Sequence, residues 1–170
     1  MSARVVGLDL SMSATGLADP DGWTTTIKPK LAGDERLVEI AFGVTERVLD
    51  ARLAVIEEAP PGLKGPAIKA IHMVHGAVRH QLVVVGLRYV TVNPTTLKRY
   101  ATGKPAATKT EMALALYKRW FGLELADDNQ VDAWWLRAAG LELLGEPAVK
   151  LPAVQVAALD VVRGQLAVAS

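Results

Sequence analysis

The most informative absence in this 170-residue sequence is cysteine, of which there is none. Without thiolates the chain cannot form disulfides, hold an iron–sulfur cluster or a cysteine-ligated zinc ion, or use a cysteine nucleophile. No apolar run approaches the roughly 20 residues that a membrane-spanning helix needs. The acidic Asp9 comes too early for a signal-peptide apolar region. We therefore expect a soluble, cytoplasmic protein that does not contact membranes.

Acidic residues are scarce in one part of the chain only. Between residues 59 and 123 there are ten lysines and arginines but a single acid, Glu111, which gives this segment a net charge of +9. The remainder carries −8, so the whole chain is close to neutral at +1. A basic segment between acidic flanks is typical of a polyanion-binding surface beside a carboxylate site. The asymmetry alone is also compatible with a solvated basic face.

The length and a hydrophobic content of 51% favour one globular domain, which we place at residues 1–150, with a C-terminal tail at 151–170. Hydrophobic periodicity and capping residues predict alternating elements. Strands are predicted at 4–10, 17–18, 23–27, 53–57 and 88–92. Helices are predicted at 34–50, 67–85, 93–100, 108–121 and 128–144, with a short one in the tail at 155–166. This order indicates an α/β fold with an antiparallel meander followed by parallel strands.

Two carboxylates stand where apolar strands end. Asp9 closes the first predicted strand, and Glu57 closes the fourth. In open α/β sheets the carboxyl ends of strands are where ligands bind. If the two strands are neighbours, these like charges oppose each other unless a cation lies between them.

A third acidic group opens the helix predicted at 128–144. Asp128 and Asp132 are four residues apart and share a helix face. Asp127 is interpreted as the N-cap, whereas capping cannot explain Asp132, which lies one turn into the helix on its buried side. Oxygen ligands without thiolates suit Mg²⁺ or Mn²⁺. Two such ions about 4 Å apart would activate a water for phosphodiester cleavage.

With these residues in view, the chain resembles the RuvC-type Holliday-junction resolvases over residues 5–144. Gly7–Gly16 is similar to the family's opening strand, which ends in Asp before a turn of small and hydroxyl residues. Val55–Glu58 is similar to its second acidic strand, with Glu57 as the matching acid, and Asp128–Ala133 resembles its acidic helix. Leu97-Lys98, Thr102-Gly103 and Lys109 match its basic segment. The short format is most similar to the phage-borne branch, which would place the protein in the host cytoplasm.

The resemblance implies an RNase H-like fold with a five-stranded mixed sheet in the order 3-2-1-4-5. It also implies a homodimer that uses Mg²⁺ to nick symmetry-related strands of four-way junctions, leaving 5′-phosphate and 3′-hydroxyl ends. The expected site is a set of four metal-binding, catalytic carboxylates, Asp9, Glu57, Asp128 and Asp132. Asp9 is expected to bridge two ions, and Mn²⁺ is expected to substitute for Mg²⁺. The expected DNA-binding residues are Lys98, Lys104 and Lys109.

The sequence departs from the family in two places. Better-known bacterial members have the last two acidic-helix ligands three residues apart, a spacing that selects Asn129 here and leaves Asp128 beside it. They also carry an aromatic residue soon after the catalytic Glu, where this chain has Ala59-Pro60-Pro61-Gly62. Two alternatives stay open. One is a nuclease of the same fold that acts on structured RNA or an RNA–DNA hybrid, and the other is a non-catalytic nucleic-acid-binding module.

Overall fold

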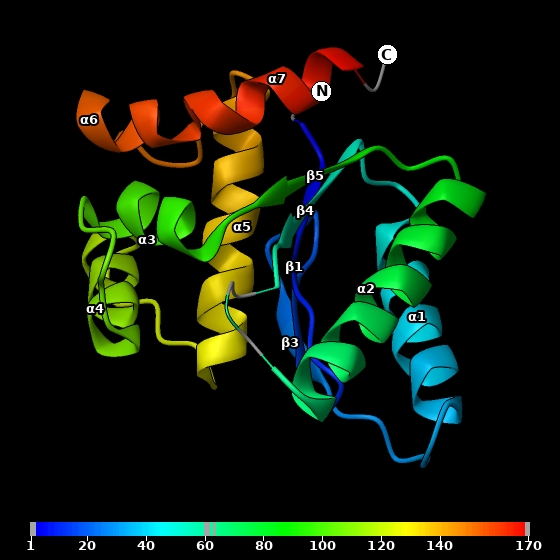
Figure 1. Ribbon diagram of the computed structural model, residues 1–170. Helices are drawn as coiled ribbons and strands as arrows, with labels where there is room; N and C mark the ends of the chain where they lie inside the picture. Colours follow the sequence, from blue (N-terminus) through cyan, green and yellow to red (C-terminus); the bar gives the residue numbers. More distant parts are fainter. Residues whose placement is uncertain (1–2, 60–61, 63, 169–170) are drawn as a thin grey trace.

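A five-stranded mixed sheet forms the centre of the protein, in the order β3-β2-β1-β4-β5 (Figure 1). The strands are β1 (Val5–Asp9), β2 (Thr15–Ala18), β3 (Thr24–Ile27), β4 (Leu53–Glu57) and β5 (Tyr89–Val92). The first three pair antiparallel, whereas β4 pairs parallel with both β1 and β5. The predicted order and the predicted meander are therefore confirmed. The computed structural model describes residues 3–59, 62 and 64–168, so Pro60 and Pro61 lie outside the described residues.

Helices cover both faces of the sheet (Figure 1). Helices α1 (Glu35–Val48) and α2 (Pro66–Val84) lie on one face. On the other face α5 (Asp128–Leu143) packs directly on β1, and α3 (Pro94–Thr102) and α4 (Lys109–Arg119) pack beside it. The chain ends in α6 (Ala153–Val156), the 3₁₀ turn η1 (Ala157–Leu159) and α7 (Asp160–Val168). No helix in the described ranges is long and apolar enough to cross a membrane.

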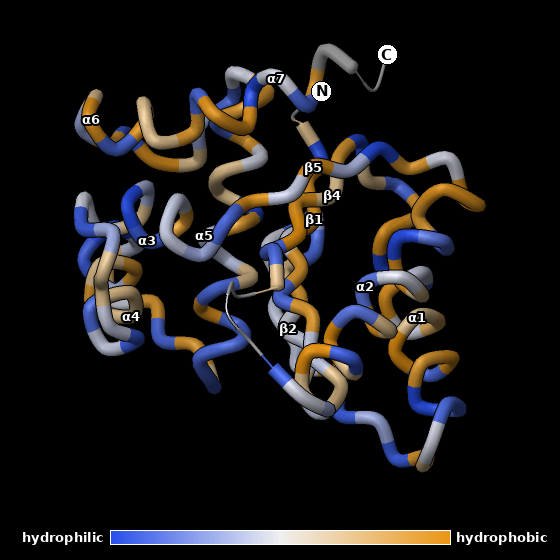
Figure 2. The backbone as a smooth tube through the Cα atoms, in the orientation of Figure 1, coloured by the Kyte–Doolittle hydropathy of each residue, from blue (hydrophilic) through white to orange (hydrophobic). Residues whose placement is uncertain are grey.

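The alternation of side chains along the strands divides the core in two. In β1, Val5 belongs to the hydrophobic cluster under α5, whereas Val6 and Leu8 belong to the cluster under α1 and α2. Figure 2 shows hydrophobic residues concentrated along these central strands. The tail contributes Leu159 and Val162 to the α5-side cluster, and both are buried. The C-terminal helical segment is therefore packed against the same core as the strands.

Local sequence signals explain where the helices near the site begin. The Asn93 side chain accepts a hydrogen bond from the Thr95 amide at 2.9 Å, and Pro94 follows as the first residue of α3. Thr108 and Glu111 form the predicted capping box of α4, because each side chain accepts a hydrogen bond from the other residue's amide. These caps fix the start of both helices that carry the predicted basic residues.

Candidate active site

Asp9 and Glu57 are the final residues of two adjacent parallel strands. In the β1–β4 pair Leu8 is aligned with Ile56, so the next residue of each strand is a carboxylate. Both side chains are half-buried at the carboxyl edge of the sheet. The two strands are neighbours, which was the condition for these carboxylates to lie at the same edge.

Glycines bring the acidic helix onto the same edge. A Cβ atom at Gly7 would lie 2.6 Å from the amide nitrogen of Arg137 and closer still to the carbonyl oxygen of Ala133. A Cβ atom at Gly16 would lie 2.5 Å from the carbonyl carbon of Asn129. Real side chains do not approach backbone this closely, so only glycine allows α5 to rest directly on β1 and β2. This close packing places the first turns of α5, including Asp132, over the end of β1.

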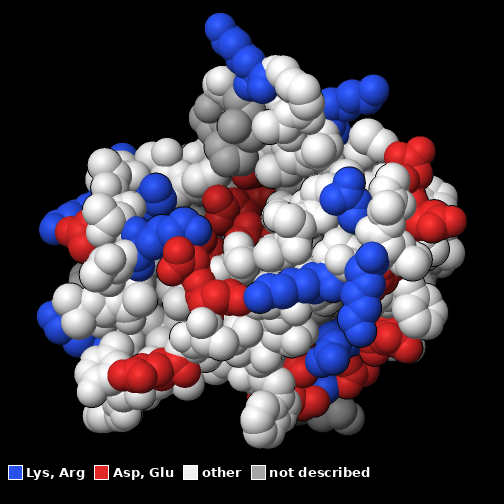
Figure 3. All heavy atoms as spheres, turned by 90° about the horizontal axis from the view of Figure 1, so that it is seen from below, with Lys and Arg blue, Asp and Glu red and all other residues white. Residues whose placement is uncertain are grey.

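Asp9, Glu57 and Asp132 line one cavity of about 370 Å³. Its polar lining also includes Lys98 from α3 and Lys109 from α4. The space-filling view of this end of the molecule shows acidic side chains in a central hollow with lysine and arginine side chains on either side (Figure 3). An acidic depression bordered by cations suits a phosphodiester whose backbone is held by the cations while the carboxylates face the reacting phosphate.

Burial and mutual repulsion shift the ionisation of these carboxylates. Burial, followed by the charge of Asp132, raises the pKa of Asp9 to about 7. Burial and the charges of Asp9 and Asp132 raise the pKa of Glu57 to about 8. Burial raises the pKa of Asp132 to about 6, although Lys109 and Lys98 oppose the shift. Groups that repel one another in this way release energy when a proton or a divalent cation is bound between them.

The donor set fits a hard divalent cation, because every acidic ligand offers oxygen. In their present arrangement, no three His, Asp or Glu side chains of the described residues are grouped closely enough to hold an ion. Asp9, Glu57 and Asp132 line the same cavity, but their side chains are not close enough together to coordinate one ion. The fit therefore depends on the chemistry of the donors and on their raised pKa values.

The acids at the start of α5 have separate positions. Asp127 is the N-cap, as expected, and accepts hydrogen bonds from the Thr26 hydroxyl at 2.6 Å and the Gln130 amide at 3.0 Å. Burial opposes ionisation there, but these hydrogen bonds lower the pKa of Asp127. Asp128 is exposed, and one of its oxygens lies 3.3 Å from Nζ of Lys109. Asn129, and not Asp128, lines the cavity.

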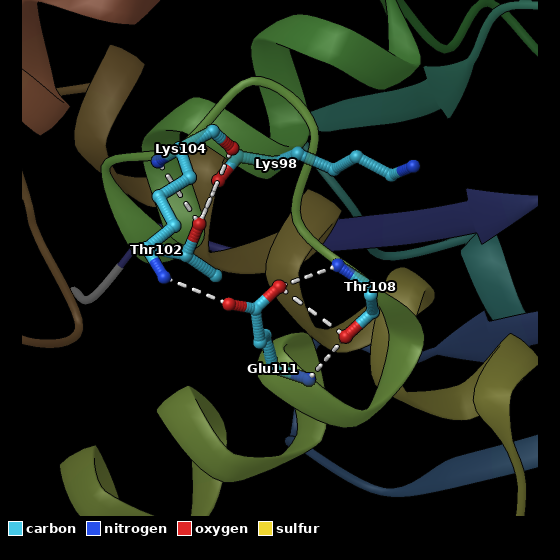
Figure 4. A network of polar contacts seen from close by, with 5 residues as sticks. All are labelled: Lys98, Thr102, Lys104, Thr108 and Glu111. Carbon is cyan, nitrogen blue, oxygen red and sulfur yellow. Dashed lines mark hydrogen bonds and ion pairs between the residues drawn. The ribbon is translucent and has the colours of Figure 1, made fainter.

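The three predicted DNA-binding lysines also differ. Lys98 and Lys109 line the cavity. Lys104 lies in the α3–α4 connection, where its Nζ forms an ion pair with Glu111 at 2.8 Å (Figure 4). In that view the Lys98 side chain extends away from the Lys104–Glu111 pair. The structure thus brings two of the three lysines to the carboxylates and pairs the third with an acid.

Two ionisable residues at the cavity were not singled out from the sequence as site residues. Glu58 follows Glu57 and lines the cavity with it. His75 of α2 also lines it and is only 5% exposed. Burial, and then the charge of Arg79, lowers the pKa of His75 to about 4, so its imidazole is neutral at pH 7. Glu58 could have been suspected from its place at a strand end, but the position of His75 depends on how α2 packs.

The fold that carries this cavity is similar to that of known proteins. No family model matches the chain, and no curated protein matches its sequence. Two solved structures of RuvC from Thermus thermophilus do match it in three dimensions. One aligns with a TM-score of 0.68 at 19% identity, covering 84% of this chain and 97% of that one. The other, RuvC in complex with a Holliday junction substrate, aligns with a TM-score of 0.70 at 20% identity, covering 85% and 97%.

The chain has the RNase H-like fold of RuvC. The fold implied by the sequence resemblance is therefore confirmed. At this level of identity the likeness concerns the fold alone. Both structures come from Thermus thermophilus, so the comparison gives no support to a phage origin.

Proposed function

We propose that the protein is a divalent-cation-dependent endonuclease that nicks branched DNA at four-way junctions. The observation that carries the proposal is the convergence of Asp9, Glu57 and Asp132 in one cavity that Lys98 and Lys109 also line. Burial raises the pKa values of all three carboxylates, and such shifted pKa values are typical of catalytic sites. The structure of RuvC with a Holliday junction supports the choice of substrate.

The chain's own residues have distinct roles in the proposed reaction. Asp9, Glu57 and Asp132 would hold Mg²⁺, with Asn129 as a neutral oxygen donor in the cavity and Asp128 as the further acid beside it. Bound Mg²⁺, or Mn²⁺ in its place, would supply Lewis-acid stabilisation of the phosphate and make water a stronger nucleophile. Lys98 and Lys109 would hold the phosphate backbone against the carboxylates. Cleavage would leave 5′-phosphate and 3′-hydroxyl ends.

Paired cuts on symmetry-related strands need two such cavities, and we propose that a homodimer supplies them. The outer faces of α1 and α2 carry exposed apolar side chains, including Val38, Phe42, Val83 and Val84. A groove between these two helices is lined by Phe42, His80 and Gln81 among others. Exposed apolar patches of this kind favour a protein partner, and we place the contact between subunits here.

The proposal is tested by comparing cleavage of a synthetic four-way junction, a linear duplex and an RNA–DNA hybrid, each with and without Mg²⁺. We expect paired, Mg²⁺-dependent nicks in the junction alone. Asp9→Asn should abolish them while the variant still binds the junction in a gel-shift assay. Cleavage confined to the hybrid would keep the carboxylate site but replace the substrate. Cleavage by Asp9→Asn at the wild-type rate would refute the assignment of the site.

A further inference from the structure

The Gln165 side chain of α7 forms hydrogen bonds with the backbone of β5 at the edge of the sheet. Strand β5 is the last strand of the sheet, and the edge of such a strand presents unpaired backbone groups. At Thr91 the Gln165 side chain satisfies both of them. Its Oε1 accepts a hydrogen bond from the Thr91 amide at 2.8 Å, and its Nε2 donates one to the Thr91 carbonyl oxygen at 3.0 Å. The side-chain amide of Gln165 thus forms the two hydrogen bonds that a neighbouring strand would form with Thr91.

The same threonine holds the end of the neighbouring strand. The Thr91 hydroxyl donates a hydrogen bond to Oε1 of Glu58 at 2.8 Å. The backbone amide of Glu58 donates to the carbonyl oxygen of Val92 at 2.9 Å. Glu58 is therefore fixed to β5 through both its side chain and its main chain. These contacts lie at the point where β4 ends and its chain leaves the sheet.

Glu58 is also the residue directly after Glu57, and the two line the same cavity. We propose that Gln165 is a positioning residue of this site, which acts through Thr91 and Glu58 to keep the Glu57 carboxylate oriented toward a bound divalent cation. The proposal rests on the function proposed above and extends it to α7. Loss of a residue that supports a metal ligand through hydrogen bonds typically reduces metal affinity by about 10- to 100-fold.

A second contact, between α7 and Arg88, the residue before β5, provides a matched control. A guanidinium nitrogen of Arg88 donates a hydrogen bond to the carbonyl oxygen of Leu166 at 2.8 Å. This contact joins the same helix to the segment that leads into β5, but it does not involve Thr91 or Glu58. If α7 only needs to be docked, loss of the Arg88 contact should have the same effect as loss of the Gln165 contact. If Gln165 acts through Thr91, only the Gln165 change should alter the site.

The test uses the full chain and four variants: Gln165→Met, Thr91→Val, the double variant and Arg88→Met. Methionine and valine keep the approximate size of the side chains they replace but cannot form these hydrogen bonds. Mn²⁺ binding to the DNA-free protein is measured by titration calorimetry, and the melting temperature is recorded for each variant. Junction cleavage at saturating substrate is measured separately from junction affinity.

We expect Gln165→Met and Thr91→Val each to weaken Mn²⁺ binding about tenfold, with a similar fall in kcat and an unchanged junction affinity. The double variant should be no worse than either single one, because both changes break one chain of contacts. Arg88→Met should lower the melting temperature but leave Mn²⁺ affinity at the wild-type value.

Three results would overturn the inference: unchanged Mn²⁺ affinity in both single variants, losses that multiply in the double variant, or an equal loss in Arg88→Met. Wild-type protein that binds no Mn²⁺ would overturn the proposed metal site, and this inference with it. Wild-type protein that binds Mn²⁺ but does not cut junctions would overturn only the proposed substrate, because the calorimetric comparison would still decide the role of Gln165.

Discussion

Gly7→Ala should disrupt the site without touching any carboxylate. The added Cβ would lie 2.6 Å from the amide nitrogen of Arg137 and closer to the carbonyl oxygen of Ala133, whereas ordinary contact begins at about 3.4 Å. Both obstacles are backbone atoms of α5, so the helix and β1 would have to separate by on the order of 1 Å. Because Asp132 precedes Ala133 on that helix, its carboxylate would move away from Asp9.

This separation should reduce both the stability of the protein and its cleavage rate. Overpacking of a closely fitted core destabilises a protein by about 3 kcal/mol at the upper end of its usual range, and urea unfolding would measure this loss in the free energy of unfolding. A misplacement of about 1 Å in an active site can reduce the rate about 100-fold. Junction cleavage under conditions where the variant is folded would measure that second loss.

Gly76→Ala is the matched control, since a Cβ there meets no other atom within 4 Å. Gly76 lies in the exposed part of α2, and alanine there should stabilise that helix by about 1 kcal/mol in the same urea unfolding measurement. Wild-type stability and a wild-type cleavage rate in Gly7→Ala would refute the argument that glycine is required for α5 to reach the sheet.

Three further predictions concern the charges and the exposed helices. Because the pKa values of Asp9 and Glu57 are raised to about 7 and 8, the folded protein retains protons that the unfolded chain, with carboxyl pKa values of about 4, has lost. The melting temperature in EDTA should therefore fall as the pH rises from about 4 to about 8, less steeply in Asp9→Asn, and a flat profile would contradict the shifts. Lys109→Ala should weaken junction binding and reduce its salt-dependence slope by about 1. Lys104→Ala should change both less, because Lys104 lies outside the cavity that Lys109 lines. Equal effects in binding titrations at several salt concentrations would argue against this ranking. Phe42 is 63% exposed, and Phe42→Glu should convert a dimer to monomers in sedimentation velocity without loss of folding. An unaffected dimer would show that the subunits contact each other at another surface.

Much of this fold could be predicted from local signals. Strand β4 begins and ends at the predicted residues, β1 is one residue shorter than predicted at each end, and β5 begins one residue later than predicted. Caps such as Thr108 and Asn93 defined helix starts because their side chains bond to amides only two or three residues away. Asp127 was likewise identified as a cap from its place in the sequence. Interactions over so short a range depend little on the rest of the chain.

The sequence by itself determined the elements, the strand-end carboxylates Asp9 and Glu57, and the chemistry that they can offer. Only the tertiary structure decided which of the remaining candidates join them. Asn129 lines the cavity while Asp128 does not, because the approach of α5 at Gly7 and Gly16 sets the rotation of its first turn. Glu58, His75 and Gln165 reach the site or its support through contacts between elements distant in sequence. Such contacts leave no periodic signal in the sequence, since they depend on how completed helices and strands pack together.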